Sequence, residues 1–317
     1  MAEADSQRDE SRAMQTPPLF RSPLNRAAHR RTDEAWLRQA WPRARVVVVD
    51  TVGGGQFLVD AQDALILVDP TSAPDGERLF LGEDADGTPY FGVDGPLPEV
   101  PDTRRVTLRQ VAHLLTERDG ALAVAAVALA YWHAAHPYSP TSGRPTTARD
   151  GGWVRTSDDG DNLWPRTDPA VIMLVHDGVA GPQGRCLLGH NAAWASPGVR
   201  RFSCLAGFVE PGESAEAAVA REVAEEVGVA VEEITYVASQ PWPFPGSLML
   251  GFLARADPDA PITVDPTEIT HAQWFTRREI AAVLDGDDVR GADGARMALP
   301  TPASIAHFLL TTWLHRG

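Results

Sequence analysis

The stretch GFVEPGESAEAAVAREVAEEVGV, residues 207–229, decides the fold of this chain because it joins a glycine-punctuated loop to a carboxylate-rich segment. Ser214 is a favourable N-cap, and Gly228 suits the left-handed position that ends many helices. We therefore predict a helix from about Ala215 to Val227.

The predicted helix has two chemically different faces. Valine recurs every fourth residue from Val219 to Val227, which predicts a buried stripe. Glu222, Glu225 and Glu226 lie three and four residues apart on another face, where like charges repel one another. The residues alone leave two interpretations: a solvated acidic surface, or a site for a divalent cation with oxygen ligands.

The spacing of the fixed positions resembles the Nudix box without a mismatch. Those positions are Gly207, Glu213, Arg221, Glu222, Val223, Glu225, Glu226, Gly228 and Val229. The resemblance favours the metal site and implies hydrolysis of a nucleoside diphosphate linked to another moiety. It makes Glu222 and Glu226 metal ligands, and Glu225 a further ligand or the base. It implies that Arg221 pairs with Glu225 or Glu213 and orients the carboxylates.

Length and charge limit the possible functions. A chain of 317 residues with 44% hydrophobic composition is long enough for two domains with their own cores. Lys and Arg total 28 against 43 Asp and Glu, giving a formal charge of −15. This balance disfavours a broad electrostatic grip on nucleic acid, so a phosphate substrate requires a metal ion, Mg²⁺ or Mn²⁺.

The cysteines and apolar runs bear on location. Two cysteines, Cys186 and Cys204, are too few for a disulfide framework or a four-cysteine zinc site. We expect both side chains to be buried in the protein, and the protein to be in the reducing cytoplasm. The N-terminus lacks the apolar core of a signal peptide. The longest uncharged apolar run, 121–132, is too short to cross a bilayer, so we predict no membrane segment.

The first half of the chain predicts a small α+β domain over residues 31–136, after a polar and mobile tail over residues 1–30. β-Branched runs at 45–50, 57–59 and 64–68 predict strands, and residues 33–105 are interpreted as an antiparallel sheet. The expected helices cover residues 32–41, 107–115 and 121–135, the last two separated by a turn at ERDG, 117–120.

Residues 137–168 are rich in Pro, Gly, Ser, Thr and Asp, which predicts a connector. This place resembles that of the zinc ribbon in the NADH pyrophosphatase branch of the Nudix family. Ser139 and Ser142 stand at the first cysteine pair, and Thr156 and Asp159 at the second. Because hydroxyls are poor zinc ligands, we predict that no structural zinc binds.

Residues 169–317 complete the chain as the predicted catalytic domain. The expected strands are 170–175, 186–190, 204–208, 234–240, 247–256 and 271–276, with a closing helix at 301–315. The mixed order of strands and helices lacks the regular alternation of a doubly wound parallel sheet. The predicted class is α/β, an α/β/α sandwich with a mixed sheet as in Nudix domains.

A second motif, SQPWPFPGS at 239–247, alternates proline with aromatic residues. Three missing N–H groups exclude a helix or a central strand and predict a stiff, extended loop. Composition alone is compatible with a rigid connector whose rings cap the core. The motif also resembles the array that distinguishes Nudix enzymes hydrolysing NADH. That resemblance implies contacts to the dinucleotide from Gln240, Pro241, Trp242, Pro243, Phe244, Pro245, Gly246 and Ser247.

The same resemblance implies an adenine clamp. Phe208 corresponds to one stacking ring, and Trp164 to a second that comes from the partner subunit of a homodimer. Trp164 taken alone is also compatible with an ordered core or interface residue. Arg109 and Ala306 are weaker candidates for substrate contacts.

Two positions add to the implied metal site. Glu268 matches a later glutamate that completes the site in the family, although a lone Glu after a turn is commonly just exposed. The Ala206 carbonyl is a candidate ligand.

The expected function is metal-dependent hydrolysis of NADH and NAD⁺ to AMP and the nicotinamide mononucleotide. Removal of NAD caps from RNA is a related possibility, for which Arg30 and Arg31 offer a local basic groove. One alternative is a Nudix hydrolase preferring ADP-ribose or another conjugate, which has no need of the second motif. The other is a non-catalytic regulator that binds NAD(H), which commonly lacks a box carboxylate.

Overall fold

The computed structural model describes residues 16–194, 197–291 and 294–316. Contacts divide them into two compact units. Residues 18–169 and 240–249 form the N-terminal unit, and residues 16–17, 170–239 and 250–316 form the C-terminal unit. The second motif therefore belongs by its contacts to the N-terminal unit.

The N-terminal unit contains a sheet in the order β1-β4-β3. Its strands are β1 (Arg45–Val49), β3 (Leu79–Glu83) and β4 (Pro89–Asp94), and β2 (Phe57–Val59) pairs separately with β5 (Arg104–Val106). The prediction of an antiparallel sheet is wrong for β1 and β4, which are parallel. The long connection between them permits this, whereas the hairpin partners β3 and β4 are antiparallel.

The predicted strand over 64–68 is also wrong. Leu65 and Val68 make only isolated bridges, to Val59 and Val46 respectively. The segment therefore contributes single contacts to two different strands and does not extend either sheet.

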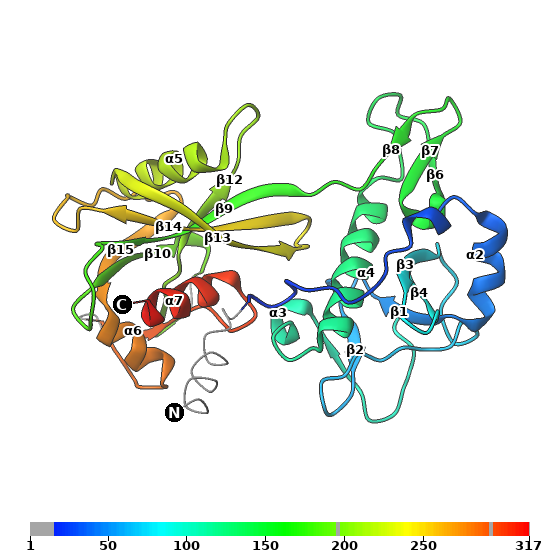
Figure 1. Cartoon of the computed structure of the whole chain (residues 1–317), viewed down its shortest axis with the longest axis horizontal. Coiled ribbons are helices and arrows are strands. Elements are labelled where there is room, and N and C mark those ends of the chain that lie inside the picture. The colour runs from blue at the N-terminus through cyan, green and yellow to red at the C-terminus, as the bar shows by residue number, and fades with distance from the viewer. Residues whose placement is uncertain (1–15, 195–196, 292–293, 317) are drawn as a thin grey trace, which may run out of the picture. The chain divides into compact units, whose positions relative to one another are not determined.

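Helix α4 (Glu117–Ala135) packs against the sheet, as Figure 1 shows, and Leu122, Ala126 and Ala130 are buried in that contact. The predicted turn at 117–120 is wrong. Thr116 caps the helix by accepting the Asp119 N–H, so the ERDG segment forms the first turn of α4. Acidic residues are favourable there because they face the positive end of the helix dipole.

Shorter elements complete the unit. They are η1 (Ala28–Arg30), α2 (Glu34–Ala40), η2 (Trp41–Arg43), α3 (Leu108–Val111), β6 (Thr146–Arg149), η3 (Asp150–Gly152), β7 (Val154–Ser157) and β8 (Asn162–Leu163). The structure departs from the expected mobile tail over residues 16–30, since Leu19 and Leu24 pack on the core and Asn25 bridges to Glu83. Residues 1–15 lie outside the described part.

The C-terminal unit contains a sheet in the order β13-β14-β9-β10-β15, with β12 paired to β9. Its strands are β9 (Asp168–His176), β10 (Arg185–Asn191), β12 (Leu205–Phe208), β13 (Val231–Trp242), β14 (Ser247–Ala256) and β15 (Ile269–Thr276). The predicted strand positions are confirmed. The second motif adjoins β13, which is an edge strand, so its prolines cost few sheet hydrogen bonds.

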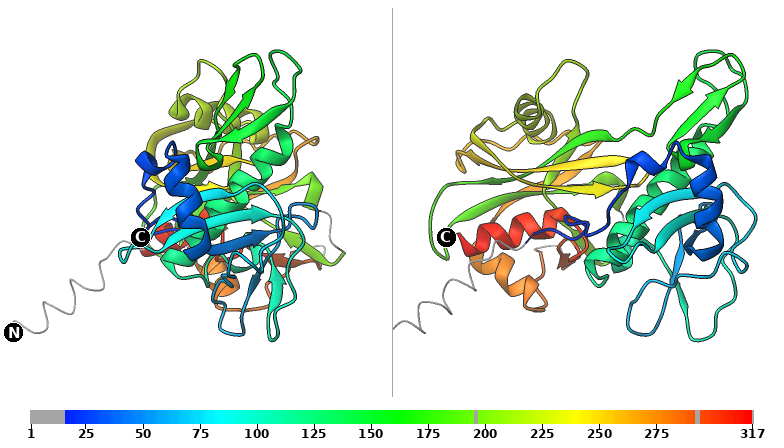
Figure 2. Two further views of the ribbon diagram at one scale, coloured as in Figure 1. Left: turned by 90° about the vertical axis from the view of Figure 1, so that its right-hand side faces the viewer. Right: turned by 45° about the vertical axis from the view of Figure 1, so that its right-hand side comes forward.

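Helices cover both faces of this sheet, as Figures 1 and 2 show: α5 (Ala215–Val227) lies on one face, and α6 (Arg277–Leu284) and α7 (Ile305–His315) lie on the other. Between α5 and the sheet lies a hydrophobic core that includes Val219, Val223 and Met173. The predicted α/β class with a sandwich architecture is confirmed.

Some elements of the C-terminal unit were not predicted. They are α6, η4 (Ala192–Trp194) and the parallel pair of β11 (Val199–Arg201) with β16 (Arg296–Ala298). Helix α7 begins at Ile305 and not at 301, because Ser304 caps it by accepting the Ala306 N–H. Within the described residues, no helix is long and apolar enough to span a membrane.

Candidate active site

Helix α5 carries the central box residues, and its predicted bounds, Ala215–Val227, are confirmed. Ser214 caps the helix by accepting the Ala217 N–H at 3.2 Å. Gly228 has a φ of 72° and donates its N–H to the Ala224 carbonyl. Both ends are therefore pinned, which fixes the direction in which the carboxylates point.

Arg221 binds three box carboxylates at once. Its Nε and Nη2 donate to the two carboxylate oxygens of Glu213 at 2.8 and 2.9 Å. Its Nη1 donates to Glu222 and to Glu225, both at 2.9 Å, and its Nη2 also donates to the Phe208 carbonyl. The Arg221 hydrogen bond lowers the pKa of Glu213 to about 2. Arg221 thus ties the loop before the helix to the helix itself.

Glu226 is the most buried of the box carboxylates, with 4% of its surface exposed. Burial raises its pKa to about 8, and the charges of Glu222 and Glu268 add to this effect. A hydrogen bond from the Ala206 backbone acts in the opposite direction. The Glu226 Oε2 atom is buried without a hydrogen-bond partner in the described part of the chain. A buried carboxylate oxygen beside two other carboxylates is suited to a cation.

The donor atoms fit a hard divalent ion. Glu222 is also buried, and burial raises its pKa while Arg221 opposes the rise. Among the described residues, no three Asp, Glu, His or Cys side chains already converge around a common point that could hold a metal ion. Arg221 takes one Glu222 oxygen, which leaves the other oxygen for a cation. An oxygen-only set fits Mg²⁺ or Mn²⁺.

Glu268 reaches this cluster because the segment before β15 caps the end of α5. The Thr263 N–H donates to the Val227 carbonyl at 2.9 Å, and the Asp265 N–H donates to the Glu226 carbonyl at 3.1 Å. These bonds satisfy carbonyls that the end of a helix leaves without partners. They also place Glu268, which follows Asp265 by one tight turn, near Glu226.

Gly207 in β12 allows the Glu222 side chain to approach the sheet. A Cβ at position 207 would overlap the Glu222 carboxyl group. The glycine of the box is therefore required by this close approach, and its backbone conformation needs no left-handed φ. Glu225 differs from its neighbours because its side chain is 59% exposed and pairs with Arg221.

The second motif folds as a strand end followed by a tight turn, and not as the fully extended loop that its prolines suggested. Gln240 to Trp242 finish β13, and residues 243–246 form the turn. The Trp242 and Phe244 rings meet edge to face, with centroids 5.1 Å apart. Gly246 accepts the Asp168 N–H at 2.8 Å.

The side chains of the motif divide into two sets. Gln240, Pro243 and Ser247 are buried, and the Gln240 amide donates to the Pro18 carbonyl at 3.0 Å. Pro245 is exposed, while Pro241, Trp242, Phe244 and Gly246 are partly exposed. The first set holds the turn in place, and the second leaves surface for a ligand.

Arg109 stacks on the motif from α3. Its guanidinium lies 4.3 Å from the Phe244 ring centroid and 5.3 Å from that of Trp242. Burial lowers its pKa, and no carboxylate within the described residues forms an ion pair with it. A partly buried cation on two aromatic rings is suited to an anionic group of a nucleotide.

The two predicted clamp rings are both exposed: Phe208 by 59% and Trp164 by 64%. They belong to different compact units of one chain. Ala306 is different, since it is 1% exposed and its carbonyl faces Cys204 Sγ. Its position in the core of the C-terminal unit gives Ala306 a packing role, and its side chain offers little surface to a substrate.

At the position of the resembled zinc ribbon, hydrogen bonds connect the two loops. Ser139 Oγ donates to Asp161 at 2.8 Å and accepts the N–H groups of Thr141 and Ser142 at 3.1 Å. In the second loop Ser157 donates to Asp159. The partner Asp161 was missed by sequence reasoning, because it occupies neither of the resembled pairs.

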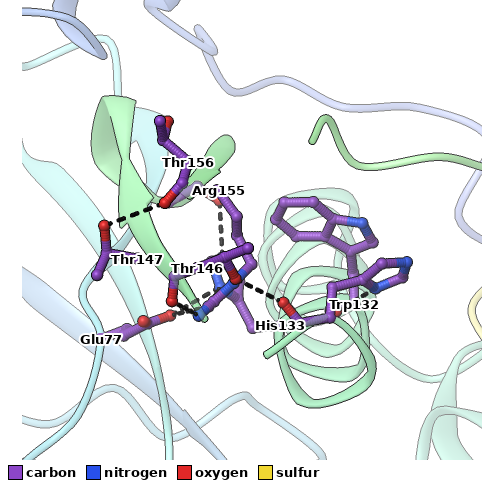
Figure 3. A network of polar contacts seen from close by, with 9 residues as sticks. Glu77, Trp132, His133, Thr146, Thr147, Arg155 and Thr156 are labelled. Carbon is purple, nitrogen blue, oxygen red and sulfur yellow. Dashed lines mark hydrogen bonds and ion pairs between the residues drawn. The ribbon is translucent and has the colours of Figure 1, made fainter. Parts of the chain in front are cut away.

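A second polar network joins this segment to α4 (Figure 3). Arg155 is 6% exposed and donates to the Thr146 hydroxyl at 2.7 Å and to Glu77 at 2.8 Å. His133 Nδ1 lies 2.6 Å from Arg155 and 2.7 Å from Glu77, while its Nε2 faces the Gly152 carbonyl at 2.8 Å. A neutral His133 ring accepts from Arg155, and a protonated ring donates to Glu77.

The box, the Arg221 bonds to its carboxylates and the helix-covered sheet define a Nudix hydrolase, and the NUDIX domain model matches residues 167–293. The chain belongs to the Nudix hydrolase family, in its NAD(H) diphosphatase branch. The NAD-capped RNA hydrolase NudC of Mycobacterium bovis is 39% identical over 308 residues, which cover 94% of each protein. The NAD-capped RNA hydrolase NUDT12 of Homo sapiens is 41% identical over 211 residues, covering 63% of this chain and 43% of that protein.

Proposed function

We propose that this enzyme hydrolyses the pyrophosphate bond of NADH and NAD⁺, releasing AMP and the nicotinamide mononucleotide, and removes NAD caps from RNA by the same reaction. The observation that carries the hydrolytic half is the Glu226 Oε2 atom, which is buried beside Glu222 and Glu268 and has no hydrogen-bond partner in the part of the chain that the structure describes. The names of the mycobacterial and human relatives support the NAD-linked half.

The roles of the box residues follow from their surroundings. Glu222, Glu226 and Glu268 would hold Mg²⁺ or Mn²⁺, with the Ala206 carbonyl as a further ligand. The bound metal neutralises pyrophosphate charge and lowers the pKa of water. Arg221 orients the carboxylates through its bonds to Glu213, Glu222 and Glu225.

Glu225 is suited to take the proton from the attacking water or to act as an additional ligand. Its side chain is 59% exposed, so solvent reaches it, and its bond to Arg221 fixes its orientation.

Recognition of the dinucleotide is assigned to the second motif. Arg109 would meet a phosphate, and the surface of Trp242 and Phe244 would contact a base or ribose, because the three groups stack together. In this proposal Phe208 and Trp164 clamp the adenine, with Trp164 supplied by the second chain of a homodimer.

The second motif favours NAD(H) over ADP-ribose, because its folded surface and its cation form a binding element that hydrolysis alone does not require. The non-catalytic alternative is disfavoured because all box carboxylates are present, and Arg221 orients three of them, Glu213, Glu222 and Glu225. The two buried, free thiols support a reducing compartment, and we place the enzyme in the cytoplasm.

The test is a comparison of kcat/KM for NADH, NAD⁺, ADP-ribose and an NAD-capped RNA, with Mg²⁺ and with Mn²⁺. We expect NADH or the capped RNA to exceed ADP-ribose by about tenfold or more, and EDTA to abolish turnover. Equal or higher rates with ADP-ribose would move the assignment to the first alternative. Binding of NADH without any hydrolysis would move it to the second.

We also propose that no structural zinc is bound. The Ser139–Asp161 bond connects the two loops that a zinc ion would otherwise join, and the Arg155–Thr146 bond joins the strands that carry them. Elemental analysis of the purified protein should find well below one zinc per chain. One zinc per chain that resists dialysis against a chelator would contradict this.

A further inference from the structure

Arginine side chains stack on three half-buried tryptophans of the N-terminal unit. Arg31 and Arg26 lie 3.6 and 5.8 Å from the Trp153 ring centroid. Trp36 carries Arg30 at 4.9 Å and Arg43 at 6.0 Å. On Trp41, Arg78 lies at 4.1 Å. We call these eight residues the Arg–Trp surface.

The three tryptophans are joined through one pair of core residues. The Trp153 indole donates to the Phe80 carbonyl at 2.7 Å, and the Trp36 ring meets the Phe80 ring edge to face at 5.4 Å. Trp41 makes the same contact with Phe91, whose ring lies 5.3 Å from that of Phe80. The stacked cations therefore surround one compact region of the unit.

The charges of this surface are not compensated. Within the described residues, none of its five arginines forms an ion pair with a carboxylate, whereas nearby arginines such as Arg45 do. Burial lowers the pKa of Arg31, and the positive charge of Arg26 lowers it further. The Nε atoms of Arg30 and Arg31 are buried and have no hydrogen-bond partner among the described residues. This cationic region exists in a protein with a net charge of −15.

A guanidinium backed by a tryptophan offers two kinds of contact. Its outer plane can stack on a nucleobase, and its N–H edge can donate to phosphate oxygens. An acidic peptide uses only the second contact, since it has no planar bases. The combination of unpaired charge and stacked planes is therefore suited to a single-stranded nucleic acid.

We propose that the Arg–Trp surface binds the single-stranded RNA that follows an NAD cap. This inference rests on the proposed function, because the cap is the group that the carboxylates and the second motif act on. It extends the expected groove at Arg30 and Arg31 to a defined set of cations. It also explains how an acidic enzyme holds a polyanion, since the binding charge is concentrated on one region.

The test removes the three exposed arginines of the surface in a triple variant, Arg26→Gln, Arg43→Gln and Arg78→Gln. The matched control, Arg21→Gln, Arg45→Gln and Arg104→Gln, removes the same charge from arginines of the same unit that pair with carboxylates. Both are checked by thermal unfolding. The measurements are kcat/KM for NADH and for an NAD-capped RNA of about ten nucleotides, and binding of uncapped RNA by fluorescence anisotropy at several salt concentrations.

We expect the triple variant to lose about tenfold or more in kcat/KM for the capped RNA and in affinity for uncapped RNA, with kcat/KM for NADH unchanged. The salt dependence of RNA binding should fall by about two in logarithmic slope. The control should stay within about twofold of the parent for both substrates. If the ratio of kcat/KM for the capped RNA to kcat/KM for NADH is the same in the triple variant as in the parent, the proposal is overturned.

Two further outcomes separate the explanations. Equal loss in the control variant would overturn the proposal by showing a general charge effect. Polyglutamate competing as well as uncapped RNA would overturn it in favour of an acidic protein partner. If the parent enzyme hydrolyses no NAD-linked substrate, the proposed function fails, and the anisotropy measurement still tests the surface.

Discussion

At the scale of single residues, the site is governed by the contrast between Glu226 and Glu225. Glu226 is buried and its pKa is raised to about 8, whereas Glu225 has an exposed side chain that is bound to Arg221. Both lie on the same helix and are adjacent in sequence. Their difference comes from the rotation of about 100° between adjacent positions of a helix, which points Glu226 toward the sheet and Glu225 toward solvent.

The Glu226→Gln variant should lose turnover by about 100-fold or more while its folding stability stays equal or rises. Burial and two neighbouring charges make the ionised Glu226 carboxylate unfavourable in the metal-free protein. The substitution removes this unfavourable contribution to the folding free energy. Steady-state kinetics and thermal unfolding with and without Mg²⁺ measure both effects. The parent should be stabilised by Mg²⁺ and the variant should not. Glu216→Gln, an exposed change in the first turn of α5, is the control. Parent-like turnover at saturating metal would exclude Glu226 as a ligand.

The Gly207→Ala variant should lower kcat/KM by roughly 10- to 100-fold, because the added methyl group displaces the Glu222 carboxyl. The metal concentration needed for half-maximal activity should rise in parallel. A titration with Mg²⁺ measures this shift. If the variant keeps the parent's metal dependence, the close approach of Gly207 to Glu222 is not needed for the reaction.

At the scale of elements, buried polar contacts join α4 to the small sheet formed by β6, β7 and β8. Arg155 is central because a buried guanidinium needs all its partners satisfied. The hydrogen bond with His133 is the main cause that lowers the pKa of Glu77, and the charge of Arg155 contributes.

This shift predicts how stability depends on pH. Because the folded pKa of Glu77 lies below its ordinary value of 4.5, its contribution is present above pH 4.5 and is lost as the pH falls through the folded pKa. Urea unfolding of the parent and of Glu77→Gln should therefore differ near neutral pH and converge in acid. Glu34→Gln, which breaks an exposed pair with Arg38, is the control with little effect at any pH. A difference that persists undiminished at pH 3 would contradict the assignment.

At the scale of the whole molecule, the exposure of Phe208 and Trp164 bears on assembly. Both side chains are more than half exposed, so each leaves an aromatic face available to a second chain or to an adenine. In the proposed homodimer, each adenine lies between Phe208 of one chain and Trp164 of the other.

Phe208→Ala and Trp164→Ala should each weaken NADH binding roughly tenfold or more and leave the box carboxylates intact. Mixing the two variants should restore activity, since a heterodimer keeps one site with both rings. Activity is followed after subunit exchange has been demonstrated with labelled chains. Sedimentation as a monomer, or no recovery despite exchange, would exclude the shared clamp and leave Trp164 without a role in binding.

Local signals in the sequence were sufficient for helix α5, its two caps and most strands of the C-terminal unit. The box residues encode a helix with one apolar stripe, and this pattern depends only on neighbours within about one turn. Two predictions failed because they used only such local signals. The ERDG segment has the composition of a turn, yet with Thr116 as N-cap it forms the first turn of α4. Strand β1 is parallel to β4 because of a pairing between residues that are distant along the chain.

The sequence by itself determined the family motif, the position of helix α5 and which box carboxylates that helix carries. Only the tertiary structure decided that the Glu226 Oε2 atom lacks a hydrogen-bond partner among the described residues, that Glu268 lies near it, and that Arg221 binds three carboxylates together. It also decided that arginines from separate segments stack on tryptophans around Phe80 and pair with no carboxylate of the described residues. Burial and charge pairing depend on residues that are distant along the chain, and spacing within a motif carries no information about them.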